Sequence, residues 1–176
     1  AVKIKAGNAR DAQQISAKGT LKSGFNNITL DKFVFRTPAD NIRPMIPIPV
    51  GRIGGRAIIE LDEYKVARSA FDQSSTVGFC RILSGEALWT KAEIQIGSPI
   101  NLGTFTGALS CENNEVLLTF DGENRLGLSG QGRVSKTRSL HFDGLVDPDK
   151  TLPNSIVNGV AMFGKRDQQG RYQINI

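Results

Sequence analysis

The sequence predicts an all-β protein, built as a curved, twisted antiparallel meander sheet with little helix; a sheet folded over on itself is the alternative form. Two observations predict this class. In the second half of the chain, short stretches alternate between apolar and polar residues, which is the period of a half-buried strand. A few residues rich in Gly, Asn and Pro separate these stretches, and strands joined by such short turns are usually antiparallel neighbours.

Residues 1–37 are expected to supply N-terminal strands or a hairpin of the same sheet. Residues 2–5 are strand-like, and residues 15–21 and 28–35 predict a hairpin around a turn at 22–27. An alternative stays open at residues 9–17, which could equally form a short helix.

Residues 38–55 predict a connector rich in Pro and Gly. Four of the seven prolines lie in residues 38–49, where they exclude a helix interior or a central strand. An extended connector that crosses the sheet surface or its edge is the favoured interpretation. A docking peptide is the alternative, because apolar Pro-rich segments also serve as ligands.

Residues 56–176 are expected to form the main antiparallel sheet, and the whole chain one domain. In the clearest strand, residues 87–96, alternate residues from Leu88 to Ile96 share one face. Further strands are predicted at residues 57–62, 115–121, 126–134, 140–146 and 172–176. Turn sequences at residues 97–99, 112–114, 121–124 and 147–149 separate them. Since the chain offers almost no convincing helix, the apolar face must be covered by the sheet itself, another sheet, a partner or a ligand.

Charge and hydropathy narrow the classes of partner. The formal net charge is +5, but the 22 basic and 17 acidic residues are mostly interleaved, which is typical of a solvated surface and predicts no nucleic-acid partner. No stretch has the roughly 18 apolar residues that span a bilayer, and no signal peptide is seen. The chain is therefore expected to be either complete and soluble or separated from an upstream anchor.

The two cysteines, Cys80 and Cys111, lie at strand ends or within strands. With His141 they are too few for a metal site, and a catalytic thiol would need a nearby His with an orienting partner. A disulfide or two buried thiols remain, and the disulfide is favoured. It would indicate an oxidising compartment.

Residue types needed for catalysis are scarce. His141 shares a face with Ser139 and Asp143, but two residues apart on a strand usually means two solvent-exposed neighbours. Asp143, Asp147 and Asp149 resemble fragments of a calcium loop that lacks its Gly and its closing Glu. We therefore predict no enzyme, no catalytic or metal-binding residues and no cofactor. An enzyme built around His141 is kept as the weakest hypothesis.

The order of several stretches carries a family resemblance. They are residues 48–56 (IPVGRIGGR), 85–92 (GEALWTKA), 102–109 (LGTFTGAL), 126–130 (LGLSG) and 163–172 (FGKRDQQGRY), with Leu152-Pro153 before the last. Over about residues 46–176 the chain resembles protein N of the bacterial type II secretion system. It departs from the family at residues 19–24, where the family tends to carry a tryptophan and this chain has Lys22.

The resemblance implies a domain on the periplasmic side of the bacterial inner membrane. It implies a tether of one N-terminal helix, absent from this chain, and an accessory part in assembling or steadying the export machine without catalysis. The implied partners are other type II secretion components, namely inner-membrane platform proteins, with the secretin as a further candidate. The family is in turn similar to AsmA-like proteins, whose curved sheets line an apolar groove.

Two main hypotheses follow. The first is an interaction module that binds other secretion components through an exposed edge or face, with the final strand as one candidate through Arg171, Tyr172, Ile174 and Ile176. The second is a carrier of lipids or acyl chains, in which Leu118, Phe120, Leu128, Phe142 and their neighbours line a groove. What covers the apolar face of the sheet distinguishes them.

Overall fold

A computed structural model describes residues 1–45, 51–72, 77–135, 137 and 139–176. Within these residues, eleven strands form a single open sheet in which every pairing is antiparallel. The strands follow the order of the sequence except at the end, where β11 lies between β9 and β10. The all-β prediction is confirmed.

The strands differ in length, and the longest lie in the middle of the sheet. They are β1 (Val2–Ala6), β2 (Ser16–Ser23), β3 (Asn27–Pro38), β4 (Ile53–Ala67), β5 (Ile82–Ile96), β6 (Ser98–Glu112), β7 (Glu115–Asp121), β8 (Ser129–Val134), β9 (Leu140–Val146), β10 (Lys165–Arg166) and β11 (Tyr172–Asn175). The predicted hairpin of residues 15–35 is present as β2 and β3. The alternative of a short helix at residues 9–17 is wrong.

Tight turns join the long central strands, and their residues explain why. Gly97 connects β5 to β6 with φ 76°, and Asn113 and Asn114 connect β6 to β7 with φ 53° and 65°. Gly adopts positive φ without steric cost and Asn tolerates it, so the single Gly97 reverses the chain between β5 and β6, and the two asparagines reverse it between β6 and β7. The turns predicted at residues 97–99 and 112–114 are therefore in place.

The described residues also form three short helices: η1 (Ala39–Met45), η2 (Arg68–Phe71) and α1 (Asn154–Phe163). The 3₁₀-helix η1 corrects the extended conformation expected for the start of the connector, while residues 46–50 of the connector lie outside the described residues. The sequence interpretation missed α1. Pro153 precedes it, Ile156, Val157 and Val160 form its apolar stripe, and the Gly164 N–H closes it on the Val160 carbonyl at 3.1 Å.

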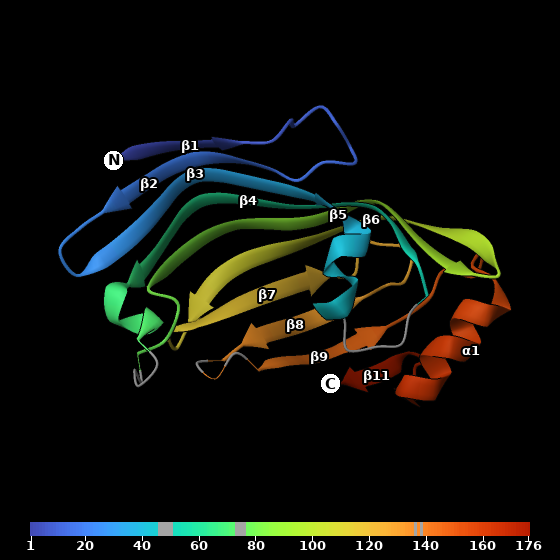
Figure 1. The fold of residues 1–176 in the computed structure, drawn as a ribbon. Helices are drawn as coiled ribbons and strands as arrows, with labels where there is room; N and C mark the ends of the chain where they lie inside the picture. Colours follow the sequence, from blue (N-terminus) through green and yellow to red (C-terminus); the bar gives the residue numbers. More distant parts are fainter. Residues whose placement is uncertain (46–50, 73–76, 136, 138) are drawn as a thin grey trace.

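Figure 1 shows the sheet curving from β1 at the top, through the long strands β4–β6, to β9 and β11 at the bottom. Cross-strand register places Leu21, Phe35, Trp89, Phe105 and Phe120 on one face, which we call the inner face. Both η1 and α1 pack against this face. The opposite side of the sheet is called the outer face.

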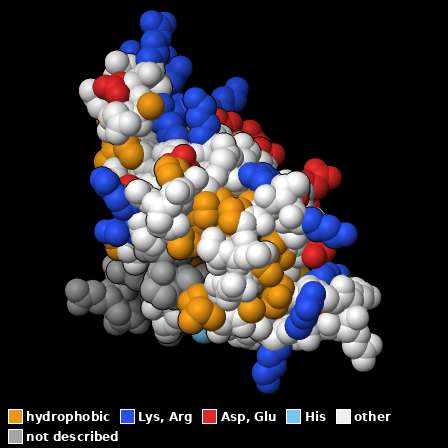
Figure 2. Space-filling model, turned by 90° about the vertical axis from the view of Figure 1, so that its right-hand side faces the viewer, with side chains coloured by type: hydrophobic (Ala, Val, Ile, Leu, Met, Phe, Trp, Pro, Cys, Tyr) orange, Lys and Arg blue, Asp and Glu red, His pale blue; other side chains and the backbone are white. Residues whose placement is uncertain are grey.

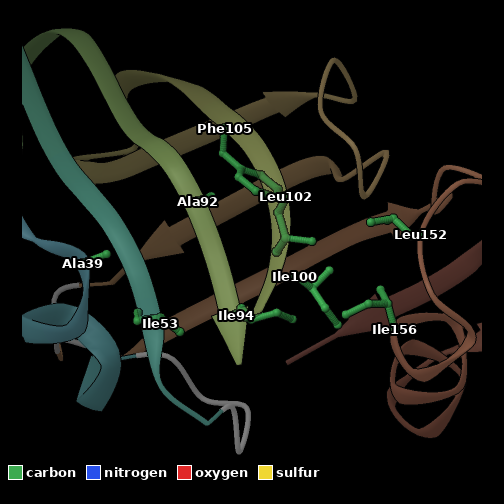
Figure 3. Close-up of a cluster of buried hydrophobic side chains, with 9 residues drawn as sticks. All are labelled: Ala39, Ile53, Ala92, Ile94, Ile100, Leu102, Phe105, Leu152 and Ile156. Carbon is green, nitrogen blue, oxygen red and sulfur yellow. The ribbon is translucent and has the colours of Figure 1, made fainter. Parts of the chain in front are cut away.

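The two buried clusters lie at the end of the sheet nearest α1. One cluster joins Ala39 of η1, Ile53 of β4, the strands β5 and β6, and Leu152 and Ile156 around α1 (Figure 3). A second cluster, made of Val146, Tyr172 and Ile174, joins β9 to β11. A smaller covered part of the inner face lies near η2, where Val66 of β4 and Ala70 are 2% and 5% exposed.

Two strands depart from the alternation that the sequence predicts. In β5, Lys91 adopts φ 50° at a bulge, which brings Trp89 to the same face as Ala92 and Ile94, although the period of two places them on opposite faces. Residues 126–134 were expected to form one strand, but β8 begins only at Ser129. Leu126 instead packs against the core from a loop.

Candidate interaction site

The final strand β11 holds the four residues predicted to contact a partner. Tyr172 and Ile174 are only 9% and 7% exposed, since both side chains point into the core. Ile176 packs against the same cluster, and its N–H and C=O are hydrogen-bonded to Phe142 of β9 at 2.9 and 2.8 Å. Three of the four side chains are thus turned inward and offer little contact surface.

Arg171 belongs to the turn between β10 and β11. Its guanidinium lies 2.9 Å from the Asp167 carboxylate, which also accepts the N–H groups of Arg171 and Gln169 at 2.9 Å each. Burial acts to raise the pKa of Asp167, but these hydrogen bonds together outweigh it and lower that pKa below its usual value. Arg171 therefore fixes the local turn.

The backbone edge of β11 is only partly covered. β10 pairs with β11 at Lys165↔Gln173 and Arg166↔Tyr172, and no described strand pairs with the outer side of β11 beyond Gln173. The Arg166 guanidinium lies 5.8 Å above the Tyr172 ring, which holds the short strand in place. What β11 can offer a partner is thus a short run of backbone.

A larger open surface lies at the other end of the sheet. Each strand from β1 to β3 is fully described, and none of them has a buried apolar side chain. We call the following seven inner-face residues the open apolar surface: Val2, Ile4, Leu21, Leu30, Phe33, Phe35 and Ile59. Val2 is 63% exposed and Ile59 38%, while the others are half-buried. Neither η1 nor α1 covers this part of the face.

The sequence interpretation placed the groove elsewhere, along Leu118, Phe120, Leu128 and Phe142. Phe120 and Leu128 pack against the buried cluster around Phe105, and Phe142 packs against the one around Tyr172, so most of these residues lie in the covered part. The open part was missed because a bulge at Lys32 (φ 47°) interrupts the alternation between Leu30 and Phe33. A search that allowed one extra residue in β3 would have joined both halves of that strand.

Among the described strands, β1 and β10 lie at the edges of the sheet, and β1 is the longer. Its five residues pair with β2 on one side, and no described strand pairs with the other. The open apolar surface reaches this edge through Val2 and Ile4. An added strand or chain could therefore use the backbone edge and the apolar face together.

A hollow of about 610 Å³ lies where the β1–β2 loop approaches η1 and the bulged ends of β4 and β5. Arg56 lines it and donates to the carbonyls of Ala9 and Asp11 at 3.3 and 3.0 Å. Asp40, Arg52 and Glu93 also line it, so charges of both signs face this space. Such a lining suits water and polar groups better than an acyl chain.

A disulfide between Cys80 and Cys111 links the segment before β5 to the end of β6, with the two Cα atoms 5.6 Å apart. Cys80 is completely buried. The neighbouring Tyr64 donates its hydroxyl hydrogen to the Phe79 carbonyl at 2.5 Å. These contacts hold residues 79–80 against β4 and the β6–β7 turn.

The residues considered as candidates for catalysis or metal binding form no site in the described part of the chain. His141 is exposed on β9, where its cross-strand neighbour is Arg133, and Asp143 accepts a hydrogen bond from Asn175 at 2.6 Å. Among the described residues, no three His, Cys, Asp or Glu side chains gather as metal ligands would. The same part of the chain contains no helix that is long and apolar enough to span a membrane.

Comparison with known protein families shows to which family the chain belongs. The family model for protein N of the type II secretion system (T2SS) matches residues 1–175, which is nearly the whole chain. The chain belongs to this family. The match includes residues 1–37, where the sequence resemblance was weakest. Neither the comparison with curated proteins nor that with solved structures gives a match.

Membership of the protein N family gives the functional context. The chain is a component of the type II secretion machinery, and this family is not known as an enzyme. The family indicates other components of that machinery as partners and a periplasmic or inner-membrane-associated location.

Proposed function

We propose that this protein N family member is an accessory component on the periplasmic side of the inner membrane, held there by an N-terminal anchor. It would help assemble or stabilise the machine by binding other components, such as inner-membrane platform proteins and the secretin, without catalysis or a cofactor. One observation carries this proposal: the open apolar surface of β1–β4 is not covered by either helix of the inner face.

The energetics favour a partner for this surface. Exposed apolar area costs roughly 25 cal/mol per Å² relative to burial, and contiguous apolar patches on folded proteins usually mark interaction sites. The side chains are aliphatic and aromatic, and Phe33 and Phe35 are the type of residue enriched in the centres of interfaces. We also propose that the backbone of Asn175, whose N–H and C=O face away from β9, adds a second, weaker contact.

Native mass spectrometry under non-reducing conditions tests the proposal. The chain would be measured alone and mixed in turn with the periplasmic domains of the inner-membrane components and the secretin. The expected result is a complex with one of them. Leu21→Gln should weaken that complex at least tenfold, because it places an amide in the apolar interface.

The matched control is Thr20→Gln, since Thr20 neighbours Leu21 on β2 but lies on the outer face. It should leave the complex within about twofold of the unsubstituted chain. Equal weakening by both variants, or no complex with any component, would contradict the proposal.

An acyl-chain carrier is the second candidate. Its support is that strand register places the open apolar surface on the inner face, and Figure 1 shows the sheet curving around that side. The same spectra distinguish the two functions, because a carrier should retain lipid after gentle purification. Co-purified lipid that Leu21→Gln removes, with no protein complex, would favour the carrier.

A further inference from the structure

The net charge of the protein lies entirely in its first three strands. Residues 1–36 contain seven of the 22 basic residues and two of the 17 acidic residues, which accounts for the whole net charge of +5. The remaining residues carry 15 charges of each sign. Figure 2 shows Lys and Arg side chains crowded in the upper part of the molecule, where β1–β3 lie in Figure 1.

Register gathers these charges on one face of the sheet. Lys3, Lys5, Lys18, Lys22 and Arg36 all lie on the outer face, because Lys5 stands opposite Lys18, Lys3 opposite Thr20, and Arg36 opposite Ser16. We call these five residues the basic outer face. All four lysines are exposed. The region therefore has an apolar inner side and a cationic outer side.

Internal ion pairs neutralise only part of this charge. Lys22 pairs with Asp31 at 2.8 Å and Arg36 with Glu60 at 3.5 Å. No carboxylate of the described residues pairs with Lys3, Lys5 or Lys18. Moreover, like charges directly opposite each other across two strands destabilise a sheet. The Lys5–Lys18 pair would therefore be relieved by an external anion.

We propose that the basic outer face docks on a membrane surface that carries anionic phospholipid headgroups. The residue types favour headgroups over a protein partner, because lysines and threonines dominate the face. Protein interfaces are depleted in Lys and enriched in Arg and aromatic residues. Lysine is a flexible point charge that suits a fluid layer of headgroups, whereas Arg provides the fixed fork of specific pairing.

Binding of the 176-residue chain to vesicles tests this proposal by co-sedimentation. It should bind vesicles that contain phosphatidylglycerol and not vesicles of phosphatidylcholine alone, and binding should weaken as salt rises. A lysine near an anionic surface contributes about fivefold in affinity. The double variant Lys5→Gln with Lys18→Gln should therefore lower the affinity for anionic vesicles about thirtyfold. The fold should persist, because both side chains are exposed and their repulsion is removed.

The control is Lys150→Gln with Lys165→Gln, which removes the same charge from two exposed positions outside β1–β3. Equal losses from both double variants would overturn the assignment to the basic outer face. No binding to anionic vesicles would overturn the proposal and leave an acidic protein as the occupant. Displacement by inorganic phosphate, where chloride of equal ionic strength has no effect, would replace it with a phosphate-specific site. None of these outcomes bears on the partner complex at the open apolar surface, which lies on the other face.

Discussion

Tyr64 shows at the scale of one residue how the chain is held together across the sheet. Its ring lies on the inner face of β4, and its hydroxyl hydrogen-bonds the Phe79 carbonyl beside the disulfide. Burial raises the pKa of Tyr64, because a charged phenolate would lose hydration there. The neutral phenol is therefore the form that the folded state prefers.

We expect Tyr64→Phe to lower the free energy of unfolding by about 1 kcal/mol near neutral pH, through the lost hydrogen bond. The raised pKa also fixes a pH dependence. Stability from this group is fully present below the usual tyrosine pKa of about 10 and is lost as pH rises through the higher folded-state value. Urea unfolding of both proteins at neutral and alkaline pH measures this. A difference between them that does not shrink with rising pH would contradict it.

The disulfide is the second prediction at this scale. Cys80 and Cys111 are separated by 31 residues, and closing a loop of that length restricts the unfolded chain by about 3 to 4 kcal/mol on the chain-entropy model. We expect Cys80→Ala with Cys111→Ala to lower the free energy of unfolding by that amount. Reduction of the unsubstituted chain should have a similar effect in the same urea titration. Unchanged stability in both cases would refute the structural role of this bridge.

For single residues, the sequence predicted the disulfide but not which side chains of the last strand are buried. Two cysteines without metal ligands pointed to a disulfide, which the structure contains. The direction of the Tyr172 and Ile174 side chains was not foreseen, since an exposed terminal strand and a buried one share the same alternation. Only the presence of α1 and β10 beside β11 decides between them.

The strands β8 and β9 approach closely where a glycine of one faces a glycine of the other. Gly144 of β9 stands opposite Gly130 of β8, and a Cβ at position 144 would lie 2.7 Å from the Phe142 ring and against the Ser129 carbonyl. The backbone therefore leaves no room for a side chain at this place. Phe142 also makes an edge contact with Phe120, with the ring centres 6.3 Å apart.

We expect Gly144→Ala to destabilise the protein by about 1 to 3 kcal/mol, through overpacking between two backbones. Gly159→Ala is the matched control, because a Cβ there meets nothing within 4 Å and Gly159 lies inside α1. That change should instead stabilise by up to about 1 kcal/mol through helix propensity. Thermal unfolding of both variants measures the contrast. Equal effects would show that the close approach does not limit this pair of strands.

Strands could be predicted from the sequence where apolar and polar residues alternate without a break. They could not be predicted where a bulge interrupts this alternation. The turns at Gly97 and at Asn113–Asn114 followed from residues that accept positive φ. The bulges at Lys32 and Lys91 could not be foreseen, because lysine has no special preference for that conformation. The helix α1 was missed because valines and Gly159 lower its intrinsic propensity, and packing of Ile156 against the sheet compensates for this.

At the scale of the whole molecule, we propose that the chain is one domain, in which strands of residues 1–37, the connector of residues 38–55 and the sheet of residues 56–176 unfold together. All eleven described strands share one sheet, so few divisions of the chain would leave intact cores. Calorimetry should give a single transition whose van't Hoff and calorimetric enthalpies agree. Two separable transitions, with β1–β3 melting first, would contradict a single domain.

The class of fold followed from periodicity, and the family followed from the order of its motifs. The uncovered region of the inner face could not be predicted from the sequence, because it depends on where α1 and η1 pack on the folded sheet. The same limit applies to the charged face. The excess of basic residues in residues 1–36 can be counted in the sequence, but only the register of β1, β2 and β3 brings five of these cations to one face.

The central claim is that the open apolar surface binds another component of the secretion machine. Site-specific photocrosslinking in secreting cells tests it most directly, with a photoreactive phenylalanine analogue placed at Leu21 on the inner face or at Thr20 on the outer face. We predict a crosslinked secretion component from position 21 that is absent or much weaker from position 20. Crosslinks only to lipid, or equal protein crosslinks from both positions, would contradict the claim.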